Sequence, residues 1–248
     1  MKVCIVMPTY NEANNIARVL DKIHEHIKND MPNHLTNVLV VDDNSPDGSA
    51  EIVKTYQRDH PFVYLLNRNA KQGLGSAYIS GFKCALANLQ PDVIIEMDAD
   101  LSHDPSKLKS LVSGIEKGAD FVIGSRYVEG GTVPKQWGWH RKLISRGSSY
   151  ATRMLLGANV RDGAGGYRAI RSEYLRKLDL DRLNVKGYAF QAVILYHVVS
   201  LGGKVIEIPI DFVDRESGES KMQVKDMVEG FWVLLRERVK HKPMKVAS

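Results

Sequence analysis

Two aspartates, Asp98 and Asp100, stand one residue apart directly after the apolar run Val93-Ile94-Ile95. The run predicts a buried strand over residues 93–97, and ligands of open α/β sheets bind beyond the carboxyl ends of such strands. Residues i and i+2 of an extended segment point the same way, so both carboxylates can reach one hard cation. The spacing predicts a divalent-metal site for a nucleotide diphosphate. Helix capping is the alternative, and it explains Asp104, which precedes Pro105, better than the other two.

Polar segments also follow the first two predicted strands, as Pro8-Thr9-Tyr10-Asn11-Glu12 and as the run from Asp42 to Gly48. Tyr10 has the ring to stack on a base, Glu12 can accept hydrogen bonds from ribose or base, and Asp43 can bind base or sugar donors. The Asn-Ser-Pro-Asp-Gly sequence is equally typical of a turn and helix cap. Three strand ends with acids together favour a nucleotide site.

Short apolar runs alternate with amphipathic segments, which predicts βαβ units and a mostly parallel sheet with right-handed crossovers. The expected strands are residues 3–7, 38–41, 62–66, 93–97, 121–124 and 205–212, and the expected helices are 13–27, 49–57, 74–89, 105–117 and 224–239. We expect the sheet to be largely complete before residue 130. One domain over residues 1–222 would then be followed by an amphipathic helix and basic tail over 223–248.

Composition narrows the protein class. The chain has 248 residues, 44% of them hydrophobic, which suits one large α/β domain. Its two cysteines, Cys4 and Cys84, lack CxxC spacing, so we expect neither a disulfide framework nor a zinc site. This cysteine usage is typical of a protein in the reducing cytosol. The first apolar run is too short for a signal peptide, and no run approaches the ~20 residues that span a bilayer. We expect a soluble or peripheral protein.

Charge is distributed unevenly along the chain. Residues 1–123 contain 12 Lys/Arg and 16 Asp/Glu, a net charge of −4, whereas residues 124–248 contain 22 and 13, a net charge of +9. A solvated surface explains many such excesses. Here the excess predicts an anionic partner, either a phosphate or an anionic membrane surface. Nucleic acid is not expected, because no nucleic-acid-binding motif accompanies the charge.

Nine short motifs in one order resemble the family 2 glycosyltransferases, and within them the polyprenol (dolichol) phosphate mannose synthases. They are PTYNE, DDNSPDG, GLGSAY, MDADLSHDP, GSRY, RKLISRG, GGYRA, GYAFQ and VDRESGESK, and the resemblance runs from about Val3 to Lys221. The resemblance implies a GT-A (Rossmann-like) fold with helices flanking the sheet. It also implies Mg²⁺ or Mn²⁺ and the inverting transfer of mannose from GDP-mannose to a polyprenyl (dolichyl) phosphate, giving a β-linked product.

The same resemblance implies roles for individual residues. The guanosine portion would be held by Pro8, Tyr10, Glu12, Val41 and Asp43, and the diphosphate, through metal, by Asp98, Ala99 and Asp100. Ser102 would be a third metal ligand. The acceptor phosphate would be held by Arg126, Arg141 and Ser145, and the donor pyrophosphate by Arg215 and Lys221, with Arg126 also near the donor.

Catalysis would rest on Asp100, Arg126, Arg141 and Arg215. A phosphate oxygen is already anionic near neutral pH, so the acceptor needs no strong general base, and positioning with charge stabilisation can suffice. Surface ion pairs are the alternative role for Arg126 and Arg141.

Three positions depart from the family pattern: Ala164 replaces a threonine, Val193 an acid and Asn44 a glycine. The first two leave the sugar open, so a polyprenyl phosphate transferase that uses another nucleotide sugar, such as UDP-glucose, is an alternative. A second is transfer to a saccharide hydroxyl, and a third is a noncatalytic binding protein with the same fold. Asp162 and Gln191 are plausible active-site residues, or structural caps.

A polyprenyl phosphate lies in a membrane, so we expect peripheral attachment at the cytosolic face, or help from a small membrane-anchored partner. The predicted last helix carries an apolar stripe followed by basic residues, which is typical of core packing or of a membrane surface. Trp137-Gly138-Trp139 is the other candidate for membrane contact.

Overall fold

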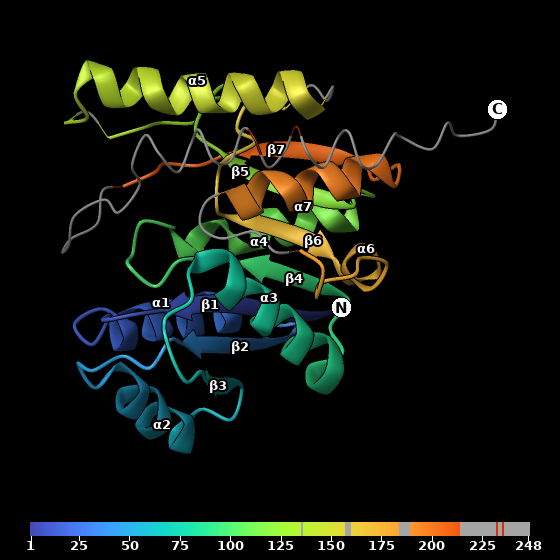
Figure 1. Ribbon diagram of the computed structural model, residues 1–248. Helices are drawn as coiled ribbons and strands as arrows, with labels where there is room; N and C mark the ends of the chain where they lie inside the picture. The colour runs from blue at the N-terminus through green and yellow to red at the C-terminus, as the bar shows by residue number, and fades with distance from the viewer. Residues whose placement is uncertain (135, 157–159, 184–188, 214–231, 233–234, 236–248) are drawn as a thin grey trace.

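A computed structural model describes residues 1–134, 136–156, 160–183 and 189–213, together with Trp232 and Leu235. Its sheet has seven strands in the order β3-β2-β1-β4-β6-β5-β7 (Figure 1). Every pairing is parallel except the two that β6 makes with β4 and β5. The strands are β1 Lys2–Thr9, β2 Leu35–Asp42, β3 Val63–Asn67, β4 Val93–Glu96, β5 Phe121–Ser125, β6 Arg168–Arg171 and β7 Val205–Pro209. The expected α/β sheet is confirmed.

Helices cover both faces of this sheet. They are α1 Ile16–Asp30, α2 Ser49–Asp59, α3 Leu74–Cys84 with a π-helical turn Ala85–Leu89, a 3₁₀ turn Pro105–Lys107, α4 Leu108–Glu116, α5 Trp139–Leu156, α6 Ser172–Arg176 and α7 Ala189–Ser200. Helices α3 and α7 pack on one face, and α1 and α4 on the other (Figure 1). Helix α2 lies at the β3 edge and α5 at the opposite end, so these two helices mark the ends of the molecule.

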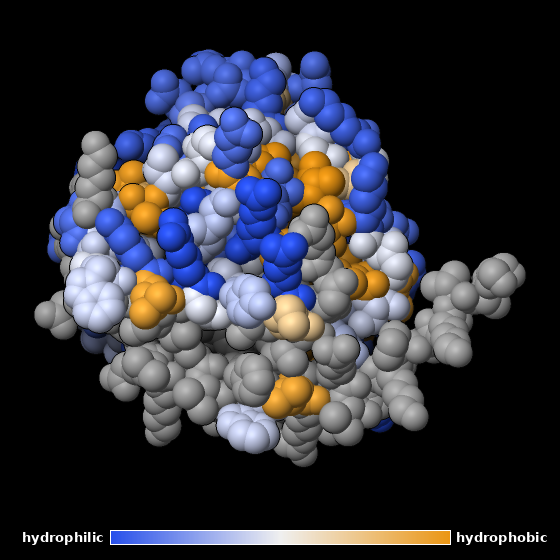
Figure 2. Space-filling view, turned by 90° about the horizontal axis from the view of Figure 1, so that it is seen from above, coloured by the Kyte–Doolittle hydropathy of each residue, from blue (hydrophilic) through white to orange (hydrophobic). Residues whose placement is uncertain are grey.

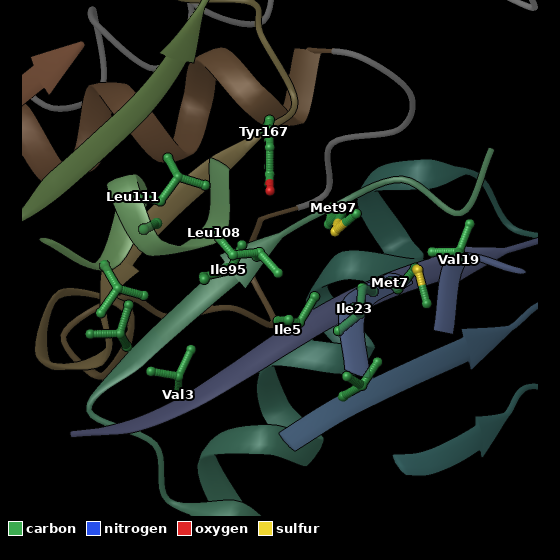
Figure 3. Close-up of a cluster of buried hydrophobic side chains, with 14 of the residues drawn as sticks. Val3, Ile5, Met7, Val19, Ile23, Ile95, Met97, Leu108, Leu111 and Tyr167 are labelled. Atoms are coloured by element: carbon green, nitrogen blue, oxygen red, sulfur yellow. The ribbon is translucent and has the colours of Figure 1, made fainter. Parts of the chain in front are cut away.

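The core consists of one apolar layer on each face. Alternate residues of β1, such as Ile5 and Met7, point to the α1 and α4 layer, where they meet Ile23 and Leu108 (Figure 3). The intervening residues, such as Val6, point to α3 and α7. Gly81 lets α3 approach the sheet closely, because a Cβ there would lie 2.4 Å from Val6 Cγ1. The two layers fix the strand ends that carry the polar segments.

The first five expected strands are confirmed with small shifts at their ends. Helix α1 begins at Ile16 and not at residue 13, because Asp47 accepts a hydrogen bond from the Ala13 amide and holds that residue in a turn. The strand expected over residues 205–212 ends at Pro209.

Five of the seven strands precede residue 130, so the sheet is largely built by then, as expected, and two strands follow. Strand β6 comes later in the chain and lies between β4 and β5, and β7 forms the edge beside β5. Helices α5 and α7 were not expected. Helix α7 is nearly all buried, so its sequence has no polar face to reveal a helical period.

The C-terminal amphipathic helix predicted over residues 224–239, and the domain boundary at 222, lie outside the described residues apart from Trp232, which is exposed, and Leu235. Within the portion of the chain that the structure describes, no helix is long and apolar enough to cross a membrane.

Candidate active site

Three neighbouring parallel strands end at the same edge of the sheet. In their register Pro8 lies beside Val41 and Val6 beside Glu96, so the segments after β1, β2 and β4 emerge together. The carboxyl edge of a parallel sheet is where α/β proteins bind ligands. The predicted nucleotide and metal residues are therefore brought to one place.

Asp98 and Asp100 follow β4 as predicted. The Asp100 carboxylate is buried, and its Oδ1 accepts hydrogen bonds from the Ser102 hydroxyl at 2.6 Å and the Ser102 amide at 3.0 Å. Leu101 between them has φ +65°, a tight turn that brings Ser102 back onto Asp100. Asp98 is more open, with 29% of its side chain exposed. Ser102 thus lies where a third ligand was predicted, and it also orients Asp100.

His103 is a site residue that the sequence motifs did not reveal. Its Nδ1 accepts a hydrogen bond of 3.0 Å from the Asp98 amide, so the ring proton belongs on Nε2, which lies 4.0 Å from Asp98 Oδ2. The ring is buried and stacks on Tyr167 at 4.8 Å between centroids. This histidine fixes the backbone and faces the carboxylate of the first predicted ligand.

The donor set at this edge fits a divalent cation. Two carboxylates and a hydroxyl are hard oxygen ligands, which Mg²⁺ and Mn²⁺ prefer. Across the described ranges no three His, Cys, Asp or Glu side chains form a metal cage of their own. Mg²⁺ commonly retains water and takes substrate phosphates as co-ligands, so two protein carboxylates suffice. The residues therefore suit a cation shared with a diphosphate.

The predicted base-binding residue Asp43 has a partner that the sequence did not disclose. Arg68 Nη1 donates to Asp43 Oδ1 at 2.5 Å, and both side chains are largely buried. Burial raises the pKa of Asp43, although the charge of Arg68 opposes this shift. Arg68 also donates to Ser76 on α3 at 2.6 Å. The arginine ties the end of β2 to helix α3 and sets the position of Asp43.

Tyr10 and Glu12 lie beside Asp43 at the end of β1. Lys71 Nζ lies 3.9 Å from the centre of the Tyr10 ring. Glu12 accepts from the Asn15 side chain at 2.8 Å, and its own amide donates to the Ser49 hydroxyl. Glu12 therefore lies in the turn before α1 and joins this turn to the first residue of α2. Lys71 adds a cation that the sequence motifs did not indicate.

The rest of the run from Asp42 to Gly48 has the turn chemistry that was the alternative interpretation. Asp42 accepts two hydrogen bonds from Ser45, and Asp47 accepts from the amide and hydroxyl of Ser49 at the start of α2. Asn44 has φ +59°, the left-handed conformation in which asparagine is tolerated and glycine is favoured. Here Asp42 and Asp47 shape the loop, whereas Asp43 forms an ion pair with Arg68.

Arg126 follows β5 and forms a buried ion pair with Asp162. Its Nε and Nη2 donate to the two carboxylate oxygens at 2.8 and 2.7 Å, and its amide donates at 2.9 Å. Burial alone would raise the pKa of Asp162, but Arg126 outweighs this and holds it below its usual range. Arg126, the predicted acceptor arginine, is thus held by Asp162. The sequence had left open whether this aspartate is a structural cap or an active-site residue.

Arg141 and Ser145 lie on α5. The Arg141 guanidinium carbon lies 4.1 Å from the centre of the Trp137 ring, and Ser145 accepts a hydrogen bond of 2.6 Å from the Tyr127 hydroxyl. Trp137 is buried against Phe212, so its predicted membrane contact is wrong for this residue, whereas Trp139 is exposed. Trp137 instead supports Arg141.

A buried charged cluster lies behind the aspartates. Arg168, fully buried on β6, donates to the carbonyls of Gly163, Gly165 and Gln191. It pairs in register with Glu96, whose pKa burial raises to about 7 against the opposing charge of Arg168. Gln191 lies close to Gly166, since its Nε2 is 3.7 Å from the position that a Cβ on that glycine would take. Arg168 therefore fixes the loop that carries Asp162 and Ala164.

Three positions named in the sequence analysis remain, namely Val193, Arg215 and Lys221. Val193, where an acid is common, is fully buried in the apolar layer of α7. Arg215 and Lys221 lie outside the described residues.

Comparisons with known proteins agree with this geometry. Residues 4–179 match the family described as Glycosyl transferase family 2. The chain is 43% identical over 222 residues to the undecaprenyl-phosphate mannosyltransferase of Micrococcus luteus, covering 90% of this chain and 88% of the relative. It is 39% identical to the polyprenol monophosphomannose synthase of Mycolicibacterium smegmatis, with 92% and 83% covered. The dolichol-phosphate mannosyltransferase of Pyrococcus furiosus is 36% identical, with 92% and 61% covered.

Solved structures share the fold. The glucosyl-3-phosphoglycerate synthase of Mycobacterium tuberculosis superposes with a TM-score of 0.69 at 19% identity, covering 95% of this chain and 79% of that one. The mannosyl-3-phosphoglycerate synthase of Rubrobacter xylanophilus gives 0.66 at 17% identity, with 100% and 77% covered. Another structure of the Mycobacterium enzyme contains Mn²⁺ and UDP-glucose. These likenesses establish the GT-A type of architecture.

Proposed function

This chain belongs to glycosyl transferase family 2, and we propose that it transfers mannose from GDP-mannose to a polyprenyl phosphate, in the presence of Mg²⁺ or Mn²⁺. The protein is a glycosyltransferase. One observation carries the proposal: three relatives at 36–43% identity, each covering at least 90% of this chain, are polyprenyl-phosphate or dolichol-phosphate mannose transferases by name.

We assign each part of the proposed reaction to a group of residues. Tyr10, Glu12 and Asp43, with Pro8 and Val41 beneath them, stand where the guanosine would bind. Asp98 and Asp100, with the backbone of Ala99 between them and Ser102 behind, would hold the cation. Arg126, Arg141 and Ser145 would receive the acceptor phosphate. Arg215 and Lys221 remain proposed contacts of the donor pyrophosphate.

The proposed reaction is a single displacement. An acceptor phosphate oxygen forms a bond to the anomeric carbon while the bond from that carbon to the GDP oxygen breaks, and GDP leaves with the electron pair. Attack from the opposite face gives the β-linked product. The cation, when bound, would act as a Lewis acid on the departing diphosphate.

Arginines suit the acceptor side because a guanidinium fork matches phosphate oxygens better than an ammonium does. Arg126 is pre-oriented, since Asp162 binds its Nε and Nη2 edge and its amide. Ser145 is held by Tyr127 and Arg141 by Trp137. Pre-organised groups of this kind stabilise developing charge without reorganising during the reaction.

A transfer assay tests the donor and the acceptor together. A short polyprenyl phosphate in detergent would be offered with GDP-mannose, UDP-glucose or GDP-glucose, each radiolabelled. We expect a lipid-linked product with GDP-mannose. A product only with UDP-glucose would favour a polyprenyl phosphate glucosyltransferase, and no lipid-linked product from any donor would overturn the assignment as a lipid-phosphate transferase.

The cation is tested separately by calorimetry of GDP and Mn²⁺ binding, a readout independent of turnover. Asp98→Asn and Asp100→Asn should each weaken Mn²⁺-dependent GDP binding by at least about tenfold, because each removes a carboxylate ligand. Asp104→Asn is the matched control, since this aspartate caps the 3₁₀ turn through Ser106. Equal GDP affinity in all three variants would contradict the metal assignment.

The lipid acceptor also implies a location. We propose that the protein works at the cytosolic face of a membrane as a peripheral protein, alone or with a small membrane-anchored partner.

A further inference from the structure

A cavity of ≈ 400 Å³ lies between α5, the segment after β5 and the segment before β6. Four arginines line it: Arg126 after β5, Arg146 and Arg153 on α5, and Arg161 before β6. Ser149 and Tyr150 of α5 add hydroxyl groups. Among the described residues that line it there is no acidic side chain, so this part of the lining forms a concave basic surface with room for more than one phosphate group.

Most of this positive charge is unbalanced. Arg126 is neutralised by Asp162, whose carboxylate it binds through two nitrogens. Arg146, Arg153 and Arg161 are exposed, and no side chain within the described part of the protein forms an ion pair with them. Three guanidinium groups around one cavity favour a ligand with several anionic oxygens.

An apolar stripe runs along the outer face of α5 beside this cavity. Trp139, Leu143, Tyr150 and Met154 are 78%, 64%, 64% and 61% exposed. At 3.6 residues per turn these four positions fall within about 60° of one another, and Arg146 and Arg153 fall on the flank of the same stripe. Tyr150 belongs both to the stripe and to the cavity wall.

Hydrophilic and hydrophobic side chains are mixed on this face of the molecule (Figure 2). Figure 2 looks down on the α5 end of the molecule, where strongly hydrophilic and hydrophobic side chains lie next to one another. A helix with large exposed apolar residues along one line and cations beside it has the composition of a helix that lies in a membrane interface. An anionic lipid meets both parts, because its phosphate faces the cations and its chains face the stripe.

We propose that α5 rests on an anionic membrane surface, with its apolar stripe in the lipid and the Arg146–Arg153–Arg161 cavity holding a phospholipid headgroup phosphate. This inference rests on the proposed function, which places the acceptor in a bilayer. Arg146, Arg153 and Arg161 are distinct from the acceptor residues Arg141 and Ser145, and the two groups of residues meet at Arg126, which lines the cavity and is itself a proposed acceptor residue. Docking by α5 would therefore bring the acceptor phosphate site to the membrane plane.

Vesicle co-sedimentation of the full chain tests the proposal, with phosphatidylcholine vesicles compared with vesicles that also contain phosphatidylglycerol. We expect binding to the anionic vesicles that weakens with added salt. Each of Arg146→Gln, Arg153→Gln and Arg161→Gln should lower the partition coefficient roughly fivefold, and the triple variant on the order of 100-fold. Arg58→Gln is the matched control, because this exposed arginine lies in the last turn of α2, at the opposite end of the molecule (Figure 1).

The apolar stripe is tested by Leu143→Gln with Met154→Gln, which should lower binding to both kinds of vesicle. Leu35→Gln is its control, since Leu35 is 61% exposed at the start of β2. These are exposed positions, and unchanged thermal unfolding would verify that the variants fold. Equal binding of the triple variant and Arg58→Gln to anionic vesicles would overturn the proposal.

Two further measurements separate the possible ligands and the two hypotheses. Inorganic phosphate or a soluble phosphopeptide that binds this cavity, with no vesicle binding, would identify a site for soluble anions and overturn the membrane assignment. The detergent transfer assay is run in parallel on the unchanged protein. Lipid-linked product without anionic vesicle binding would overturn only this inference, whereas vesicle binding without product from any donor would overturn only the proposed function.

Discussion

The Asp98 amide donates a 3.0 Å hydrogen bond to His103 Nδ1, so a buried imidazole five residues along the chain holds the backbone of the first predicted metal ligand. The ring cannot turn freely, because it stacks on Tyr167. Groups that orient a ligand commonly affect metal affinity as strongly as a weak ligand does. His103 is therefore a positioning residue for the cation.

We predict that His103→Phe weakens Mn²⁺ binding in the presence of GDP by about 10- to 100-fold, because phenylalanine can keep the stack on Tyr167 but cannot accept the amide hydrogen bond. His103→Asn should be less impaired, since its side-chain oxygen can stand near the place of Nδ1. Calorimetry of Mn²⁺ with GDP measures both variants. Equal affinity in His103→Phe and the unchanged protein would show that the hydrogen bond is merely structural.

The Arg126–Asp162 pair predicts a pH-dependent stability. We expect Asp162→Asn to lower the free energy of unfolding at pH 7 by about 3–5 kcal/mol, because it leaves a buried arginine without its counter-charge. The folded state depresses the pKa of Asp162, so this contribution is present above the unfolded pKa of about 3.9 and is lost as the pH falls through the lower folded value. The difference between the two proteins should shrink in acid.

Urea unfolding at neutral pH and at a pH well below the unfolded pKa measures this difference. Asp181→Asn is the control, since its ion pair with Lys83 is exposed and should contribute little. A stability difference that is the same at both pH values would contradict the assignment of the depressed pKa to Asp162.

The sequence was most informative where local pattern and chemistry coincide. The apolar run before Asp98 predicted both the buried strand and the place of the carboxylates, and the same reasoning located Tyr10 and Asp43 at neighbouring strand ends. These inferences need only the alternation of side chains along a strand and the rule that parallel strands end at one edge of the sheet.

Other features depend on contacts between distant segments and leave no local trace. Arg68 is 25 residues from its partner Asp43, and Arg126 is 36 residues from Asp162. Strand β6 carries Arg168. From the sequence alone an arginine is expected at the surface, and this one is buried because it donates to three backbone carbonyls from other segments. Trp137 was one candidate for membrane contact, because its packing against Phe212 cannot be inferred from the sequence.

Arg68 predicts a selective effect on donor binding. We expect Arg68→Gln to raise the KM for the nucleotide sugar several-fold and to leave kcat nearly unchanged, because Asp43 loses its fixed position but no group near the reacting carbon is altered. The acceptor KM should not change. Steady-state kinetics with each substrate varied in turn measures the three constants, and Arg58→Gln is the control for loss of charge. An equal fall in kcat with an unchanged donor KM would contradict a role in nucleotide positioning.

Trp137 predicts the complementary effect on the acceptor. Its ring lies 4.1 Å from the Arg141 guanidinium carbon, a cation–π geometry that contributes about 0.5–1 kcal/mol or more where water is excluded. Trp137→Leu should therefore raise the acceptor KM by about two- to sixfold, with the donor KM unchanged, whereas Trp137→Phe should retain part of the contact. Arg141→Ala should raise the acceptor KM further, because it removes the phosphate-binding group itself. If Trp137→Leu raises the acceptor KM in a protein that already carries Arg141→Ala, the tryptophan acts on the acceptor by some other route than Arg141, and the positioning role assigned to it here is wrong.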